Sequence, residues 1–338
     1  MTLAELVLVL MWTGLTFYAV FGGADFGAGF WDLTAGSAEG GRPVRELAAH
    51  VIGPVWEANH VWLIFVLVVL WTGYPAAYSS VTSTLYIPLT AAVIGIMLRG
   101  AGFAFRKAVT ELELERAFGA AFAISSVITP FFLGTVAGAV ASGRVPIGNA
   151  SGDPITSWLN PTSVLGGTLA VSACAFLAAV FLCVDGERDA PELLDGLRAR
   201  ALGSAIACGV IALVGVGVLH EDAPDLYDGL THRGLGLVLL SAASGLATIV
   251  LVGQRRYRVA RITAVGAVVA IVWGWAAGQY PVVLEPGFTI EQAAGAHATL
   301  VAMVIAIVLG ALVLAPSLAL LLRLQQRELA KPADAPTQ

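Results

Sequence analysis

The residue types that could carry chemistry in this chain are concentrated in one short stretch, Trp56 to His60. It places an acid, Glu57, an amide, Asn59, and an imidazole, His60, directly before a long apolar run. Glu57 and His60 are three residues apart and share a face of a helix, and Asn59 adds a hydrogen-bond donor and an acceptor beside them. Such groups at the edge of a membrane span predict a proton relay that involves all three residues.

Glu57 also has a purely structural interpretation. Pro54 suits the first position of a helix, and an acid in the first turn is stabilised by the helix dipole. Helix capping therefore stays open as an alternative to proton transfer. Trp56 is interpreted as a supporting side chain near the membrane interface.

A second acid, Asp25, is expected just beyond the C-terminal end of the first span, where the helix dipole disfavours an anion. No lysine or arginine precedes Arg42 in the sequence. This violation of a local rule favours a functional carboxylate, and Asp25 is a second candidate proton carrier. A partner from another helix, such as Arg99, would make Asp25 purely structural instead. Arg99, expected at the end of the third span, is a candidate counter-ion for Asp25 or Glu57. Arg99 could equally be an interfacial anchor or contact an anionic head group.

The histidines do not suit haem binding. A b-type haem with two histidine ligands needs them at matched depth on facing helices. Only His60 is expected inside a span, whereas His50, His220, His232 and His297 are expected near the membrane surfaces. The three cysteines have no metal-ligand spacing. The chain is therefore predicted to hold no haem or metal by itself.

Transmembrane helices must position these residues. Hydrophobic residues make up 58% of the chain and charged residues 12%, against roughly 25% charged residues in an ordinary soluble domain. Gly23 and Gly27 predict the close approach of another helix. The sequence predicts an all-α polytopic membrane protein with nine spans, at approximately 3–23, 55–73, 78–98, 118–140, 162–184, 201–219, 234–252, 262–280 and 297–322.

The basic residues then predict the orientation, because cytoplasmic loops are enriched in Lys and Arg. With nine crossings, only Arg144 and Arg233 of the 18 basic residues fall on one side. The N-terminus is therefore expected outside and the C-terminus in the cytoplasm. The polar stretch would open its helix from the cytoplasmic side, and residues 331–338 are expected to be disordered.

Four segments resemble subunit II of the cytochrome bd quinol oxidases: 18–20, 23–29, 54–64 and 98–106. Their order and spacing both match, within about the first third of the chain. The helix-opening pattern includes Pro54, Trp56, Asn59 and the Val-Trp-Leu that follows His60. This chain departs from the family pattern with Glu57 where Asp is familiar, and with His60 where Gln is familiar.

The resemblance implies two four-helix bundles, at 1–142 and 160–282, and a peripheral ninth helix at 297–323. It also implies a homologous partner, subunit I, that holds the b-type haems, haem d and the quinol site. Small single-helix accessory subunits and a structural quinone or lipid are further possibilities. The complex would lie in the bacterial cytoplasmic membrane, oxidise quinol and reduce oxygen to water with cytoplasmic protons.

Two other interpretations stay open from the residues. A secondary transporter usually has broken helices and polar groups near the bilayer centre, whereas the charges here gather at the cytoplasmic ends. A purely structural membrane scaffold would need no proton carrier.

Overall fold

The computed structural model describes residues 1–37, 40–52, 56–106, 109 and 111–329, and only the backbone for 50–52, 56–58, 106, 112, 315, 318–319 and 321–329. The segment 331–338, predicted to be disordered, lies outside the described residues. Within the described ranges, eight helices are long and apolar enough to cross a membrane, or nine if the bent pair α4–α5 is one span. The all-α polytopic fold is confirmed.

The first half contains α1 (Leu3–Phe17), η1 (Tyr18–Gly22), α2 (Gly23–Leu33), α3 (Arg42–Ile52), α4 (Trp56–Gly73), α5 (Pro75–Thr84), α6 (Tyr86–Arg106) and α7 (Leu112–Ala141). The second half contains α8 (Pro161–Asp189), η2 (Pro191–Leu193), α9 (Leu194–Asp222), α10 (Pro224–His232), α11 (Leu235–Gly253) and α12 (Tyr257–Gln279). A two-stranded antiparallel hairpin, β1 (Val282–Leu284) and β2 (Phe288–Thr289), and then α13 (Ile290–Ala293) lead to α14 (His297–Leu329).

The first span is longer than predicted. The expected end at residue 23 is wrong, because α1, η1 and α2 form one apolar helix from Leu3 to Leu33. Gly22 and Gly23 do not end the helix, since small residues are tolerated where another helix packs closely against them. A π-helical turn, Tyr18–Gly22, joins the two α-helical parts. Asp25 consequently lies inside the span and not beyond it.

The third span is also displaced from its predicted position at 78–98. Pro75 starts α5 after a sharp bend, and α5 lies at 119° to the described part of α4. The hydroxyls of Ser80 and Ser83 accept hydrogen bonds from the backbone of Gly148 and Ala150. The Ser- and Thr-rich α5 is thus tied to the loop before α8, and the third span begins only at Tyr86 in α6.

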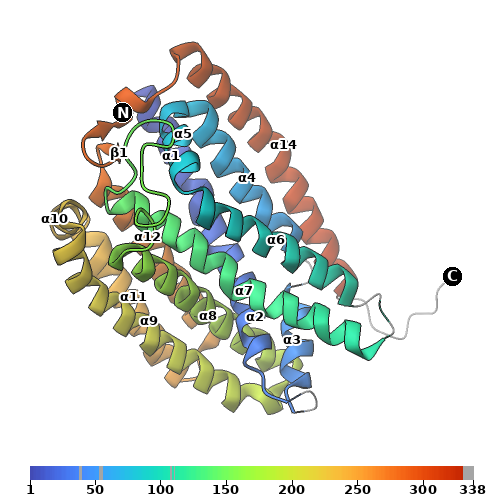
Figure 1. Ribbon diagram of the computed structural model, residues 1–338. Helices are drawn as coiled ribbons and strands as arrows, with labels where there is room; N and C mark the ends of the chain where they lie inside the picture. The colour runs from blue at the N-terminus through green and yellow to red at the C-terminus, as the bar shows by residue number, and fades with distance from the viewer. Residues whose placement is uncertain (38–39, 53–55, 107–108, 110, 330–338) are drawn as a thin grey trace.

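Helix α8 is central to the fold, because it packs against α2, α7, α9 and α12. In the most apolar 18-residue stretch of α8, 61% of the residues are buried, whereas the share is 11% in α11 and in α14. Helix α14 packs on α1 and α4 (Figure 1). The N-terminus, α5, α10 and β1 lie at one end of the helix array and α3 at the other (Figure 1). An ion pair of 2.9 Å between Arg45 and Asp32 fastens α3 to the end of α2.

Candidate functional site

Asp25 and Arg99 form a buried ion pair between α2 and α6. Their exposed fractions are 4% and 1%. Arg99 Nη2 lies 2.6 Å from Asp25 Oδ1 and also donates to the Asp25 backbone carbonyl at 2.9 Å. The expectation that Arg99 ends its helix is wrong, because α6 continues to Arg106 and surrounds the guanidinium with protein. The structure thus brings Arg99 to the acid for which it was a candidate counter-ion.

Further groups on α2 and α7 contact the Arg99 guanidinium. Its Nη1 donates to Ser126 Oγ on α7, and Ser126 in turn donates to the Phe122 carbonyl at 2.5 Å. The rings of Phe26 and Phe122 lie 4.9 and 4.3 Å from its Cζ. Aromatic faces stabilise a cation that has lost its hydration, so three helices cooperate to hold this charge.

Glycines make the close approach around this pair possible. A Cβ on Gly29 would meet Ser126 Oγ and, at 2.9 Å, Arg99 Nη1. A Cβ on Gly27 would meet the backbone carbonyl of Cys174 on α8. The predicted close approach at Gly27 is confirmed, and α8 is the helix that approaches.

Asn59 and His60 lie next to each other on α4, and the His60 ring lies close to Phe26. Asn59 is 1% exposed, and its Nδ2 has no hydrogen-bond partner among the described residues. The half-buried His60 ring has its centroid 6.2 Å from that of Phe26 and 6.5 Å from that of Tyr18. Because Phe26 also contacts Arg99, the imidazole and the ion pair border the same aromatic side chain.

The interpretations of Glu57 and Trp56 concern side chains outside the described part of the structure. Only their backbone is described, in the first turn of α4. Glu57 is therefore placed two residues before Asn59 and three before His60 on the same helix, and its side-chain contacts stay a prediction.

Tyr18 and Ser126 belong to the site although the sequence did not single them out as candidates. Among the described residues, the Tyr18 hydroxyl, Asp25 Oδ2 and Arg99 Nε have no hydrogen-bond partner, and all three atoms are buried. Buried polar groups are normally satisfied by protein or by ordered water. The sequence contained one signal that could have pointed to Tyr18, because Tyr18 and Asp25 are seven residues, or about two helical turns, apart.

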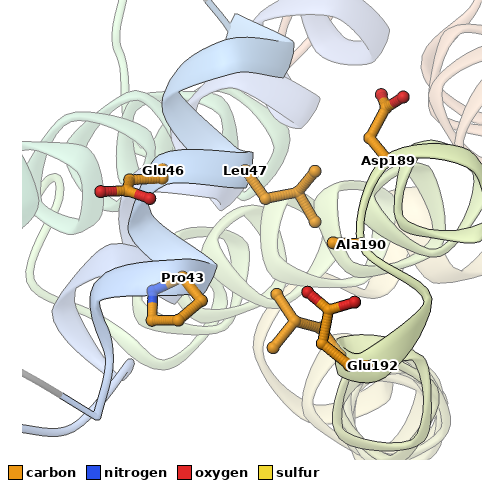
Figure 2. Close-up of a pocket in the computed structure, with 7 residues that line it drawn as sticks. Pro43, Glu46, Leu47, Asp189, Ala190 and Glu192 are labelled. Carbon is orange, nitrogen blue, oxygen red and sulfur yellow. The ribbon is translucent and has the colours of Figure 1, made fainter.

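A cavity lies elsewhere, between α3 and the connection from α8 to η2 (Figure 2). It measures about 460 Å³ and is lined by Pro43, Glu46, Leu47, Asp189, Ala190, Glu192 and Leu193. Glu46 and Asp189 each pair with an arginine at 2.7 Å. None of the candidate residues whose side chains are described lines this cavity. In the described ranges, no group of three His, Cys, Asp or Glu side chains could hold a metal ion.

The fold and the site define a polytopic helical membrane protein with a buried charge pair beside amide and imidazole side chains. The family model described as cytochrome bd terminal oxidase subunit II matches residues 3–325, and the chain belongs to this family. The resemblance seen in four segments of the sequence is thereby confirmed over almost the whole chain.

Individual relatives agree with this assignment. The chain is 30% identical to cytochrome bd ubiquinol oxidase subunit 2 of Bacillus subtilis over 45% of this chain and 44% of the relative. It is 26% identical to cytochrome bd-I ubiquinol oxidase subunit 2 of Escherichia coli K12 over 60% of this chain and 54% of the relative. These alignments span about half the length of the relatives. A chain of the bd oxidase from Geobacillus thermodenitrificans matches with a TM-score of 0.80 and 26% identity, over 96% of this chain and 98% of that one.

Proposed function

We propose that this chain is the accessory subunit of a bd-type quinol:O2 oxidoreductase and pairs with a homologous, haem-bearing subunit I. The family match over residues 3–325 is the observation that carries this proposal. The partner would hold the b-type haems and haem d, which pass electrons from quinol to oxygen. The contribution that we propose for this chain's own residues does not involve these haems.

That contribution is the supply of protons for the reduction of oxygen to water. Glu57 is the proposed carrier at the N-terminal end of α4, and Asn59 and His60 follow within one turn of the same helix. Asp25 is the second proposed carrier: Arg99 engages its Oδ1, while its Oδ2 has no hydrogen-bond partner in the described ranges. Ordered water at these unpartnered atoms would complete the relay.

The direction of proton uptake follows from the proposed orientation. Sixteen of the 18 basic residues fall on the side at which α4 begins, which favours a cytoplasmic location for Glu57 and the C-terminus. Protons would therefore enter from the cytoplasm. This arrangement would place the chain in the bacterial cytoplasmic membrane with its N-terminus outside.

A structural scaffold is the second candidate, and the Asp25–Arg99 pair favours it. A buried ion pair that joins three helices can fix their arrangement without moving a proton. On that alternative the partner subunit supplies its own protons, and replacement of Glu57 leaves turnover unchanged.

Co-purification tests the assignment as a subunit. An affinity tag on this chain, co-expressed with the neighbouring haem-protein gene, should retain one partner that shows b-type and d-type bands in the reduced-minus-oxidised spectrum. The same chain expressed alone should show neither band. A stoichiometric b-type signal from the chain alone that disappears in His60→Ala would contradict the proposed division of labour.

A further inference from the structure

The first turns of α12 carry arginines that the proposed oxidase function does not use. Arg256, Arg258 and Arg261 are exposed. Within the described part of the chain, none of them has a carboxylate at ion-pair distance, and the first turn of α12 contains no acid. Three positive charges thus gather at one membrane-proximal end of a span without a negative partner.

Several other arginines expected on the same side of the membrane are paired with acids, although among the described residues Arg116, Arg198 and Arg200 are not. Carboxylates lie 2.7 to 3.2 Å from the guanidinium groups of Arg42, Arg45, Arg188 and Arg255. Arg255 engages Asp195, the acid in the first turn of α9. The positive-inside tendency explains why arginines lie on this side, but it does not explain why those of α12 lack partners.

The exposed face of α12 combines charge with apolar surface. Arg258 and Arg261 are three residues apart and lie on one face, and Ile262, 72% exposed, lies beside them. Val259 is 49% exposed, whereas Tyr257 and Ala260 are buried against the core. A ligand for this face therefore needs an anionic group next to a hydrocarbon part.

Arg261 is held in place before any ligand binds. Its Cζ lies 4.3 Å from the centre of the Phe181 ring on α8. Stacking uses one flat face of the guanidinium and leaves its N–H edge available to an oxyanion. The rotamer freedom lost on binding is correspondingly reduced.

We infer that this surface, formed by Arg256, Arg258, Arg261, Val259 and Ile262, binds the phosphate head group of an anionic phospholipid. Guanidinium groups bind phosphate oxygens through charge-assisted hydrogen bonds, and Val259 and Ile262 would contact the first part of the acyl chains. Clusters of basic residues directly beside a membrane span are typical of such sites. A soluble phosphate compound would leave the exposed Ile262 without a complementary group.

Native mass spectrometry of the purified two-subunit complex tests this site. The complex is stripped of lipid and titrated with cardiolipin or with phosphatidylcholine, and bound lipid is counted for the wild type and for Arg258→Gln/Arg261→Gln. The double substitution should weaken cardiolipin binding roughly 10- to 30-fold and leave phosphatidylcholine binding unchanged. An unchanged haem spectrum checks that the complex is intact.

Arg42→Gln/Arg188→Gln is the matched control, because both of its arginines are exposed but paired with acids. It should bind cardiolipin like the wild type. Equal loss in the control would reveal general charge attraction and overturn the site, as would full cardiolipin binding in Arg258→Gln/Arg261→Gln. Displacement of cardiolipin by an equal concentration of inorganic phosphate would overturn the assignment to a lipid.

Discussion

At the scale of the residue, the Asp25–Arg99 pair is the feature that most constrains this chain. Two charges with exposed fractions of 4% and 1% have lost almost all contact with solvent. Their attraction compensates for lost hydration only if further hydrogen bonds and good geometry support it. Ser126, the Asp25 carbonyl and two aromatic rings provide that support for Arg99.

The sequence identified the two charges of this pair but not their surroundings. Asp25 was recognisable because an acid was expected where the helix dipole disfavours an anion, and Arg99 because it was expected at the end of a span, within reach of such an acid. Ser126 and Tyr18 were not, since hydroxyl and aromatic side chains are common in spans and only the fold shows which of them meet a charge. The pairing was one of several open alternatives, because it joins residues 74 positions apart.

Removal of one partner of this pair should destabilise the complex. Arg99→Leu would leave Asp25 buried without a counter-ion, at a cost of roughly 3–5 kcal/mol. The melting temperature and the assembled yield of the detergent-solubilised complex should both fall. Asp25→Asn combined with Arg99→Leu should recover part of the loss. Arg42→Ala, which breaks an exposed pair, is the control and should have little effect; equal melting temperatures for Arg99→Leu and Arg42→Ala would refute the structural importance of the buried pair.

At the scale of the element, small residues decide how closely α2 approaches α8. Apolar runs located most of the spans well, because a bilayer demands a minimum length of apolar helix. Hydropathy did not detect that Leu3–Leu33 is continuous or that α5 is separate from the third span, α6. Hydropathy averaged over a stretch of sequence hardly distinguishes a segment with a few Gly, Ser or Thr residues from an ordinary apolar helix. Where the helix continues or bends is determined by the helices that pack against it.

Gly27→Ala should disrupt the contact between α2 and α8. The added methyl group would meet the Cys174 carbonyl and, at 2.7 Å, Ala178 Cβ. Overpacking of this kind typically costs about 1–3 kcal/mol, and the thermal stability and haem d content of the complex should fall. Gly209→Ala is the matched control, because nothing lies within 4 Å of its added Cβ. If Gly27→Ala were as stable as Gly209→Ala, close approach would not be required.

At the scale of the whole molecule, the candidate residues gather at one end of the first spans. The predicted all-α architecture and the family both hold over nearly the entire chain. The sequence could predict this much because composition sets the class and a run of motif residues, Pro54 to Ile64, marks the family. The sequence could not specify contacts between helices. It also left the role of Glu57 open, and a measurement of turnover is needed to distinguish proton transfer from helix capping.

Turnover of Glu57→Gln, normalised to haem d in the purified complex, tests the proposed proton supply most directly. The amide keeps the shape of the side chain but cannot relay a proton, so quinol oxidation should slow strongly while the haem spectrum stays intact. Glu57→Asp is the matched control and should retain much of the activity, because it keeps the carboxyl group. If Glu57 only stabilises the first turn of α4, Glu57→Gln should cost about 0.3–1 kcal/mol of stability and no turnover. A full-speed, spectrally normal Glu57→Gln enzyme would therefore contradict the account and leave Asp25 as the remaining candidate carrier.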